Sequence, residues 1–319
     1  MISVVIPLYN EEESLGELFD SLEAVMKGLG VDYEYVFVDD GSVDKSLLIL
    51  RELFDRSPHV KVLSFRRNHG KSAALSIGFK EARGDVIITM DADLQDDPAE
   101  IPALLKKMHE GSDLVSGWKI DRQDPWTKRL PSKFFNSVTR AMSGLKLHDF
   151  NCGLKAYRGE VARSISVYGE LHRFIPVLAG WEGFRVDEIE VRHFKRKYGH
   201  SKYGGERFLN GFFDLITVMF ITRRALKPLH FFGRISFVLF VIGLIPQIVF
   251  LVQYIGGAAL RVRPIMLGGF VLIIVALQIG SIGLLAEMIS ARGGQEPTYA
   301  MRERLVRNRE VPSGGRQPL

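Results

Sequence analysis

The chain has 319 residues, of which 46% are hydrophobic and 25% are charged, and its formal net charge is +5. This balance excludes a disordered tail and a low-complexity fibre. Its single cysteine, Cys152, excludes a disulfide framework and the zinc modules that need several cysteines, and it fits a domain that folds in a reducing compartment.

Residues 1–205 are predicted to form one α/β domain. Apolar runs at 3–7, 35–39, 60–65 and 86–90 predict buried strands, and helical spacing predicts helices at 12–29, 45–54, 71–82 and 98–110. Such alternation predicts a largely parallel sheet with helices on both faces. Ligands of these sheets bind beyond the carboxyl ends of the strands.

Acidic residues follow these strands where such a ligand would bind. Asp91 and Asp93 come after the fourth strand, with Gln95 two residues further on. An isolated Asp-X-Asp is most often a solvated turn, but here other strands also end in acids. The pattern therefore predicts that Asp91, Asp93 and Gln95 hold Mg²⁺ or Mn²⁺ against a diphosphate.

Two further segments at strand ends are open to more than one interpretation. Asp39 and Asp40 precede a Gly-Ser turn, where one acid could cap the following helix and the other could accept from a nucleobase N–H. The basic stretch 66–72, which contains Lys71, precedes a helix and suits anion binding at its N-terminus, although a solvated basic turn is an equal alternative. It lacks the spacing of a Walker phosphate loop.

An amphipathic helix is predicted between the α/β domain and the first apolar segment. Large apolar residues recur every four positions over 208–220, with basic residues at the edges. This pattern is typical of a helix that lies in the headgroup plane of a membrane. A core helix of the soluble domain is the alternative.

Two uncharged segments, 235–260 and 264–286, each exceed the ~20 residues that a helix needs to cross a membrane. Eight Lys and Arg residues flank the pair on the outside and two lie in the connecting loop, which predicts that both termini are cytoplasmic. Small residues in these segments permit close helix packing and a homo-oligomer. We expect domains at 1–205, 206–233, 234–290 and 291–319, the last a basic, surface-lying or partly disordered tail.

Five motifs together resemble family 2 glycosyltransferases of the Rossmann-like GT-A fold. The motifs are IPLYNE at 6–11, VDDGS at 38–42, NHGK at 68–71, DADLQ at 91–95 and GHSKY at 199–203. More narrowly, the chain resembles the branch that contains dolichyl-phosphate mannose synthase and bacterial undecaprenyl-phosphate glycosyltransferases. The likeness extends over nearly the whole chain, including the two spans.

The resemblance implies a role for individual residues. Pro7, Tyr9 and Glu11 match the nucleotide-binding loop, Asp39 or Asp40 the acid on the base or ribose, and Asp91, Ala92, Asp93 and Gln95 the metal and diphosphate site. Arg196, Ser201 and Lys202 match a basic loop that closes over the diphosphate. Lys119 stands where eukaryotic relatives have an arginine for the acceptor phosphate, with Arg122 nearby, and the segment 149–158 faces the acceptor.

The resemblance also implies the reaction, an inverting transfer from a UDP- or GDP-linked sugar to a polyprenyl phosphate at the inner membrane. The ionised acceptor needs little help from a base, so the cations serve the leaving diphosphate. Asp149 is a candidate acid on the acceptor side, whereas Cys152 and the histidines are expected to be non-catalytic. Another lipid or glycan acceptor, or a non-catalytic nucleotide-sugar-binding subunit, remains an alternative, and no nucleic-acid partner is expected.

Overall fold

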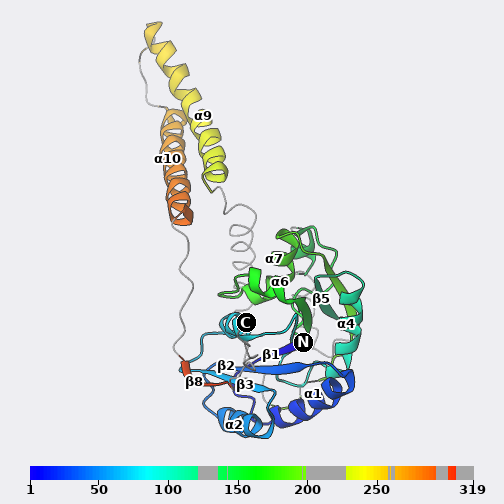
Figure 1. The fold of residues 1–319 in the computed structure, drawn as a ribbon. Helices are drawn as coiled ribbons and strands as arrows, with labels where there is room; N and C mark the ends of the chain where they lie inside the picture. Colours follow the sequence, from blue (N-terminus) through cyan, green and yellow to red (C-terminus); the bar gives the residue numbers. More distant parts are fainter. Residues whose placement is uncertain are drawn as a thin grey trace, which may run out of the picture. The chain divides into compact units, whose positions relative to one another are not determined.

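The computed structural model describes residues 1–120, 136–141, 143–195, 197–198, 228–257, 259, 263–291 and 301–306. The chain divides into two compact units. Unit 1 comprises Met1–Leu215 and Thr298–Leu319, and unit 2 comprises Ile216–Pro297. Unit 1 contains a sheet and its helices, and unit 2 contains two long helices (Figure 1).

A mixed sheet of eight strands forms unit 1 within the described residues, in the order β7-β5-β6-β4-β1-β2-β3-β8. The strands are β1 (Ile2–Leu8), β2 (Tyr33–Asp39), β3 (Val60–Phe65), β4 (Val86–Thr89), β5 (Leu114–Lys119), β6 (Lys155–Arg158), β7 (Val186–Val191) and β8 (Met301–Leu305). β1 pairs parallel with β2 and β4, β2 with β3, and β5 with β7. The expectation of a mostly parallel α/β sheet is confirmed.

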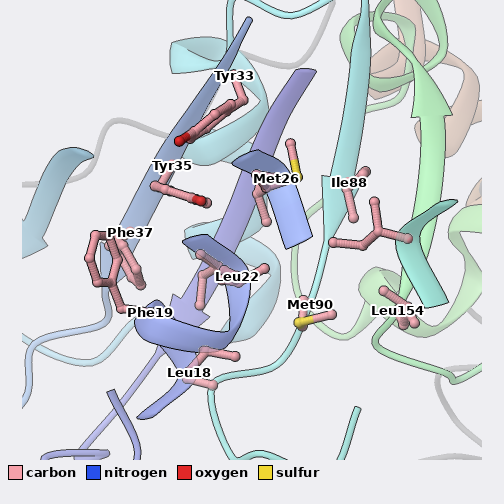
Figure 2. Packing of buried hydrophobic residues seen from close by; sticks show 14 of the residues in the cluster. Leu18, Phe19, Leu22, Met26, Tyr33, Tyr35, Phe37, Ile88, Met90 and Leu154 are labelled. Atoms are coloured by element: carbon pink, nitrogen blue, oxygen red, sulfur yellow. The ribbon is translucent and has the colours of Figure 1, made fainter. Parts of the chain in front are cut away.

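Helices cover both faces of the sheet. They are α1 (Leu15–Leu29), α2 (Ser46–Arg56), α3 (Lys71–Glu81), α4 (Ile101–His109), α6 (Gly159–Ser164) and α7 (Ile175–Trp181), with short 3-10 turns η1 (Pro98–Glu100) and η2 (Leu171–Phe174). Leu18 and Phe19 of α1 pack against Tyr35 and Phe37 of β2 in a core that α2 and α4 share (Figure 2). Because side chains alternate along a strand, the opposite face is left to α3, which packs on β1 and β2.

The segment β8 lies within 291–319, which we expected to be a surface-lying or partly disordered tail, and it shows that residues 301–305 of this stretch belong to the sheet. Residues 301–305 pair antiparallel with β3 and extend the sheet at its edge. Glu303 forms an ion pair with Arg51 of α2, and Arg304 lies 3.0 Å from Glu81 of α3. A short polar segment thus becomes a strand because β3 presents unpaired backbone groups to it.

Unit 2 is an antiparallel pair, α9 (Pro228–Ile255) and α10 (Pro264–Ala291). Both helices are long and apolar enough to cross a membrane, and only 6% and 11% of their most apolar windows are buried within the described residues. A Cβ on Gly243 would lie 2.7 Å from the carbonyl oxygen of Gly269, so glycine is what allows the two backbones to approach. Ser236 also donates to the carbonyl of Ala276 at 2.7 Å. The pair therefore packs as spanning helices do. The amphipathic helix expected over 208–220 lies outside the described residues, as does most of the expected domain 206–233.

Candidate active site

The parallel strands bring Asp39 and Asp91 to one edge of the sheet. β1, β2 and β4 run in the same direction, so the residues that follow Leu8, Asp39 and Thr89 lie at their common carboxyl edge. A small cavity opens there, and its lining includes Pro7, Lys71, Asp91, Asn151, Lys155 and His172. This edge is where the sequence predicts the nucleotide and the metal.

The first residue of α3 holds the Asp91 carboxylate. Nζ of Lys71 lies 2.5 Å from Oδ1 of Asp91. Burial by itself would raise the pKa of Asp91, but Lys71, followed by Lys119 and Lys155, lowers it to about 2. Asp91 is therefore ionised at neutral pH, and 32% of its side chain remains exposed to a ligand.

A glycine at the end of a turn makes room for the same carboxylate. A Cβ on Gly153 would lie 2.7 Å from Cγ of Asp91, which is closer than real side chains come. The turn is fixed from behind, because Oγ1 of Thr89 donates to the Gly153 carbonyl at 2.9 Å and the Lys155 ammonium donates to the Cys152 carbonyl. The backbone of Gly153 thus lies directly against the Asp91 carboxylate.

Asp93 and Gln95 lie on the same loop as Asp91, but they do not line the cavity. Asp93 is buried, with 9% of the residue exposed, and its Oδ1 accepts from the Gln95 N–H at 3.2 Å. The Gln95 amide donates to the Phe194 carbonyl at 3.4 Å. Leu94 between them has a φ of 59°, so the backbone turns sharply there. The structure gathers the three predicted ligands on one loop, and their joint binding of a metal stays a prediction.

The loop fits a divalent ion that is shared with a substrate. No three His, Cys, Asp or Glu side chains form a metal-binding group among the described residues. Mg²⁺ and Mn²⁺ are usually held by one or two carboxylates, with water and phosphate oxygens completing the set. Asp91 and Asp93 supply that number, so the donor set suits a metal–diphosphate complex rather than a closed metal cage.

Asp39 and Asp40 each fix a loop. Asp39 is fully buried and accepts from the Ser42 N–H at 2.9 Å and from the Ser64 hydroxyl at 2.7 Å. Asp40 accepts from the N–H groups of His69 and Gly70 at 2.7 and 2.9 Å, and burial raises its pKa. Neither caps α2, because the N–H of its first residue, Ser46, donates to Asp44 at 3.0 Å instead, so that alternative is wrong. Asp40 instead shapes the loop that leads to Lys71.

The loops after β1 and β2 are tied together. The Asn10 N–H donates to the Ser42 hydroxyl at 2.8 Å, and the Glu11 N–H donates to the Ser46 hydroxyl at 2.9 Å. Asn10 has a φ of 53°, which the tight turn after β1 requires. The nucleotide-binding roles implied for Pro7, Tyr9 and Glu11 stay predictions, and Pro7 does line the cavity.

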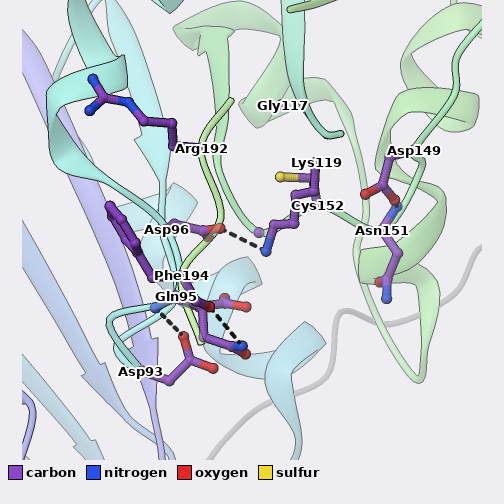
Figure 3. Close-up of polar contacts among 12 residues, drawn as sticks. Asp93, Gln95, Asp96, Gly117, Lys119, Asp149, Asn151, Cys152, Arg192 and Phe194 are labelled. Atoms are coloured by element: carbon purple, nitrogen blue, oxygen red, sulfur yellow. Dashed lines mark hydrogen bonds and ion pairs between the residues drawn. The ribbon is translucent and has the colours of Figure 1, made fainter. Parts of the chain in front are cut away.

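Lys119 ends β5 and pairs with a buried carboxylate (Figure 3). Its Nζ lies 2.7 Å from Oδ1 of Asp96, whose side chain is 0% exposed. Burial would lower the pKa of Lys119, but the Asp96 carboxylate outweighs burial and raises it above its usual value. The cation is thus held in one place, and its implied contact with an acceptor phosphate stays a prediction.

Asp149 and Cys152 are both buried in the segment expected to face the acceptor. Oδ1 of Asp149 accepts from the Asn151 N–H at 3.1 Å, so the acid shapes this turn. Burial raises the pKa of the Cys152 thiol to about 12, which agrees with a packing role rather than a nucleophile. A role of Asp149 in the reaction stays a prediction.

Two cavity residues, His172 and Lys155, belong to the site without having been predicted as site residues. Nδ1 of His172 lies 3.0 Å from the hydroxyl of Ser72, a residue 100 positions away in the chain. Burial lowers the pKa of His172, and the neighbouring Lys71 lowers it further. Burial also lowers the pKa of Lys155, although Cys152 acts in the opposite direction. Lys155 is the first residue of β6, KAYR, and no local pattern marks either Lys155 or His172. The remaining predicted residues Arg122, Arg196, Ser201 and Lys202 lie outside the described residues.

Comparison with known proteins agrees with this geometry. The family model Glycosyl transferase family 2 matches residues 3–166. Dodecaprenyl-phosphate galacturonate synthase of Rhizobium johnstonii is 36% identical over 316 residues, which cover 95% of this chain and 92% of that protein. Undecaprenyl-phosphate 4-deoxy-4-formamido-L-arabinose transferase of Edwardsiella ictaluri is 40% identical over 235 residues, 73% of this chain and 72% of that protein.

A solved structure shares the fold. Glucosyl-3-phosphoglycerate synthase from Mycobacterium tuberculosis, in complex with Mn²⁺, uridine-diphosphate-glucose and phosphoglyceric acid, aligns with a TM-score of 0.54 over 71% of this chain and 82% of that one, at 20% identity. The resemblance expected from the motifs is confirmed by the family match and by the relatives. The chain therefore belongs to glycosyl transferase family 2.

Proposed function

We propose that the chain transfers a sugar from a nucleotide-diphosphate sugar to the phosphate of a polyprenyl lipid. The observation that carries the proposal is the ionised Asp91, held at the carboxyl edge by Lys71 and a rigid turn and still partly exposed. Relatives named for dodecaprenyl phosphate and undecaprenyl phosphate as acceptors match along most of their length. Both support a glycosyltransferase whose acceptor is a polyprenyl phosphate.

The chemistry requires positive charge near the leaving nucleoside diphosphate. Lys71 and Lys155 supply two cations beside Asp91, and we assign Arg196 and Lys202 to the same task. A divalent ion, Mg²⁺ or Mn²⁺, held by Asp91, Asp93 and Gln95 would neutralise the developing charge on that leaving group. The complex of glucosyl-3-phosphoglycerate synthase with Mn²⁺ and its donor supports such an ion.

The acceptor needs position more than activation. A phosphate monoester is largely ionised near pH 7, with a second pKa of about 6, so its oxygen attacks the anomeric carbon without a strong base. Direct displacement inverts that carbon. His172 is partly buried and its pKa is lowered, so it stays neutral and contributes a fixed hydrogen-bonding group rather than a charge. We assign Lys119 to the acceptor phosphate, as a point charge.

The connectivity of unit 1 supports a location at the inner membrane with a cytoplasmic catalytic unit. β5 and β7 run parallel to β4, because both sit across antiparallel β6, so β7 ends at the carboxyl edge. β8 is antiparallel to β3, so it begins at that same edge. Strand β7 thus ends, and strand β8 begins, at the edge that carries Asp91, which supports the proposal that both ends of the helix pair lie on the cytoplasmic side.

Purified protein in detergent, incubated with radiolabelled nucleotide sugars and a short polyprenyl phosphate, tests the proposal. We expect label in the organic phase, released by mild acid as free sugar. Asp91→Asn keeps the shape of the side chain but removes its charge, so the rate of transfer should fall at least about a hundredfold. Label in another glycolipid or in a polymer would show a different acceptor. Donor binding without transfer to any acceptor would show a non-catalytic subunit.

A further inference from the structure

The buried ion pair of Asp96 and Lys119 joins two parts of the site. Asp96 lies on the loop that carries Asp93 and Gln95, and Lys119 is the last residue of β5. The Lys119 side chain is 13% exposed and that of Asp96 is 0% exposed. Neither carboxylate oxygen of Asp96 has a regular hydrogen bond within the described part of the chain, so Lys119 alone compensates its charge.

The backbone of the same loop holds a third segment. Asp96 and His193 form an isolated antiparallel bridge, and the Phe194 N–H donates to the Gln95 carbonyl at 2.9 Å. Figure 3 shows Phe194 beside Gln95, with the Asp96–Lys119 pair next to them. This segment continues β7 toward Arg196. Asp96 thus lies where three segments meet: the loop that carries Asp93 and Gln95, the end of β5, and residues 193–194.

We propose that Asp96 is a positioning residue for transfer, acting through Lys119 on the phosphate of the acceptor lipid. A lysine side chain has four rotatable bonds, and the pair with Asp96 restricts its ammonium to one place at the carboxyl edge. An ammonium carries three N–H donors, so Lys119 can pair with Asp96 and still donate to phosphate oxygens. Figure 3 shows Lys119 next to Cys152, which lines the cavity, so Lys119 lies close to the cavity wall. The inference rests on the proposed function for the identity of the acceptor.

Two variants separate this role from a purely structural one. Asp96→Asn leaves Lys119 buried without its partner, which should lower stability and raise the KM for the acceptor about tenfold, while the KM for the donor stays within about twofold. Asp96→Leu with Lys119→Met replaces the ion pair by apolar groups, which is often neutral or stabilising. The double variant should therefore regain the thermal stability of the wild type and still fail to regain the acceptor KM.

A second buried pair at the opposite edge of the sheet is the control. Lys61 and Glu34 lie 2.6 Å apart with side chains 9% and 8% exposed, near the amino ends of β3 and β2. Glu34→Gln should lower stability as Asp96→Asn does, and it should leave the acceptor KM unchanged. If the Asp96/Lys119 double variant regained both stability and acceptor KM, the pair would be structural only and the inference would be overturned.

Binding of a fluorescent polyprenyl phosphate in micelles, measured without donor, keeps the inference separate from the reaction. We expect Asp96→Asn to weaken this binding about tenfold against the wild type and against Glu34→Gln. Equal binding by the three proteins would overturn the inference. Weakened binding in Asp96→Asn, together with no transfer by the wild type, would overturn the proposed function and leave the role of Asp96 standing.

Discussion

Nζ of Lys71 lies 2.5 Å from Oδ1 of Asp91, so a lysine of the chain pairs with the carboxylate that we propose helps to hold the metal ion of the donor diphosphate. Lys71 is the first residue of α3, and the loop before it is fixed by the carboxylate of Asp40. The position of the cation is therefore set by backbone that is held in place.

The Lys71–Asp91 pair should be visible in the acid stability of the protein. The pKa of Asp91 is about 2 in the folded chain, against about 3.9 for an unfolded aspartate. The stability that the ionised carboxylate contributes is therefore present above about pH 4 and lost as the pH falls toward 2. Lys71→Met should reduce this loss, because the pKa of Asp91 rises when the ammonium is removed. Unfolding midpoints measured against pH give this loss of stability. Lys27→Met, at an exposed lysine, is the control. The same acid-induced loss in Lys71→Met as in the wild type would contradict the ion pair.

Gly153→Ala should reduce transfer without unfolding the protein. The added Cβ would lie 2.7 Å from Cγ of Asp91, so the carboxylate has to leave its position. A displacement of about 1 Å at a reacting centre costs on the order of a hundredfold in rate. Gly28→Ala in α1 is the matched control, because nothing lies within 4 Å of the new Cβ, and it should raise stability by about 0.5–1 kcal/mol. Full activity in Gly153→Ala would show that Asp91 tolerates movement.

Asp93→Asn should abolish transfer and leave membrane insertion intact. The substitution keeps the size of the side chain and removes the charge that a hard cation requires. Chelation of divalent ions should stop the wild type, and added Mn²⁺ should restore it. Asp97→Asn on the same loop keeps a side-chain oxygen that can cap the Ala99 N–H and loses the ion pair with the exposed Arg192, so it should cost less than about 1 kcal/mol of stability with transfer retained. Undiminished turnover in purified Asp93→Asn would remove the metal assignment.

His172 should make the wild type less stable at mildly acidic pH. Burial and the neighbouring Lys71 hold the pKa of His172 well below its usual value of about 6.5. The unfolded chain takes up a proton below about pH 6.5 that the folded chain does not, so stability falls as the pH drops from 7 to 5. His172→Gln removes this group and should flatten the dependence in thermal unfolding over that range. An identical slope in both proteins would show that folding does not lower the pKa of His172.

The first half of the fold was predictable because its signals are local. The apolar runs of β1 to β4 and the helical spacing between them gave elements within a few residues of the observed bounds, and the acids that follow Val38 and Met90 marked the site. β8 was not predictable from its own residues, since MRERL carries three charges and becomes a strand only against β3. The partners of the site residues were equally hidden, because Asp96, His172 and Lys155 reach them through tertiary contacts. No sequence pattern shows which acid a lysine will meet.

The pairing of β8 with β3 has a consequence for how the protein is made. Residues 301–305 leave the ribosome only after both apolar helices, so β3 remains an unprotected outer strand during most of translation. A nascent chain with such an exposed strand is prone to associate with its neighbours. The sheet acquires its outermost strand beside β3 only after α9 and α10 have been synthesised, so completion of the sheet follows completion of the helix pair.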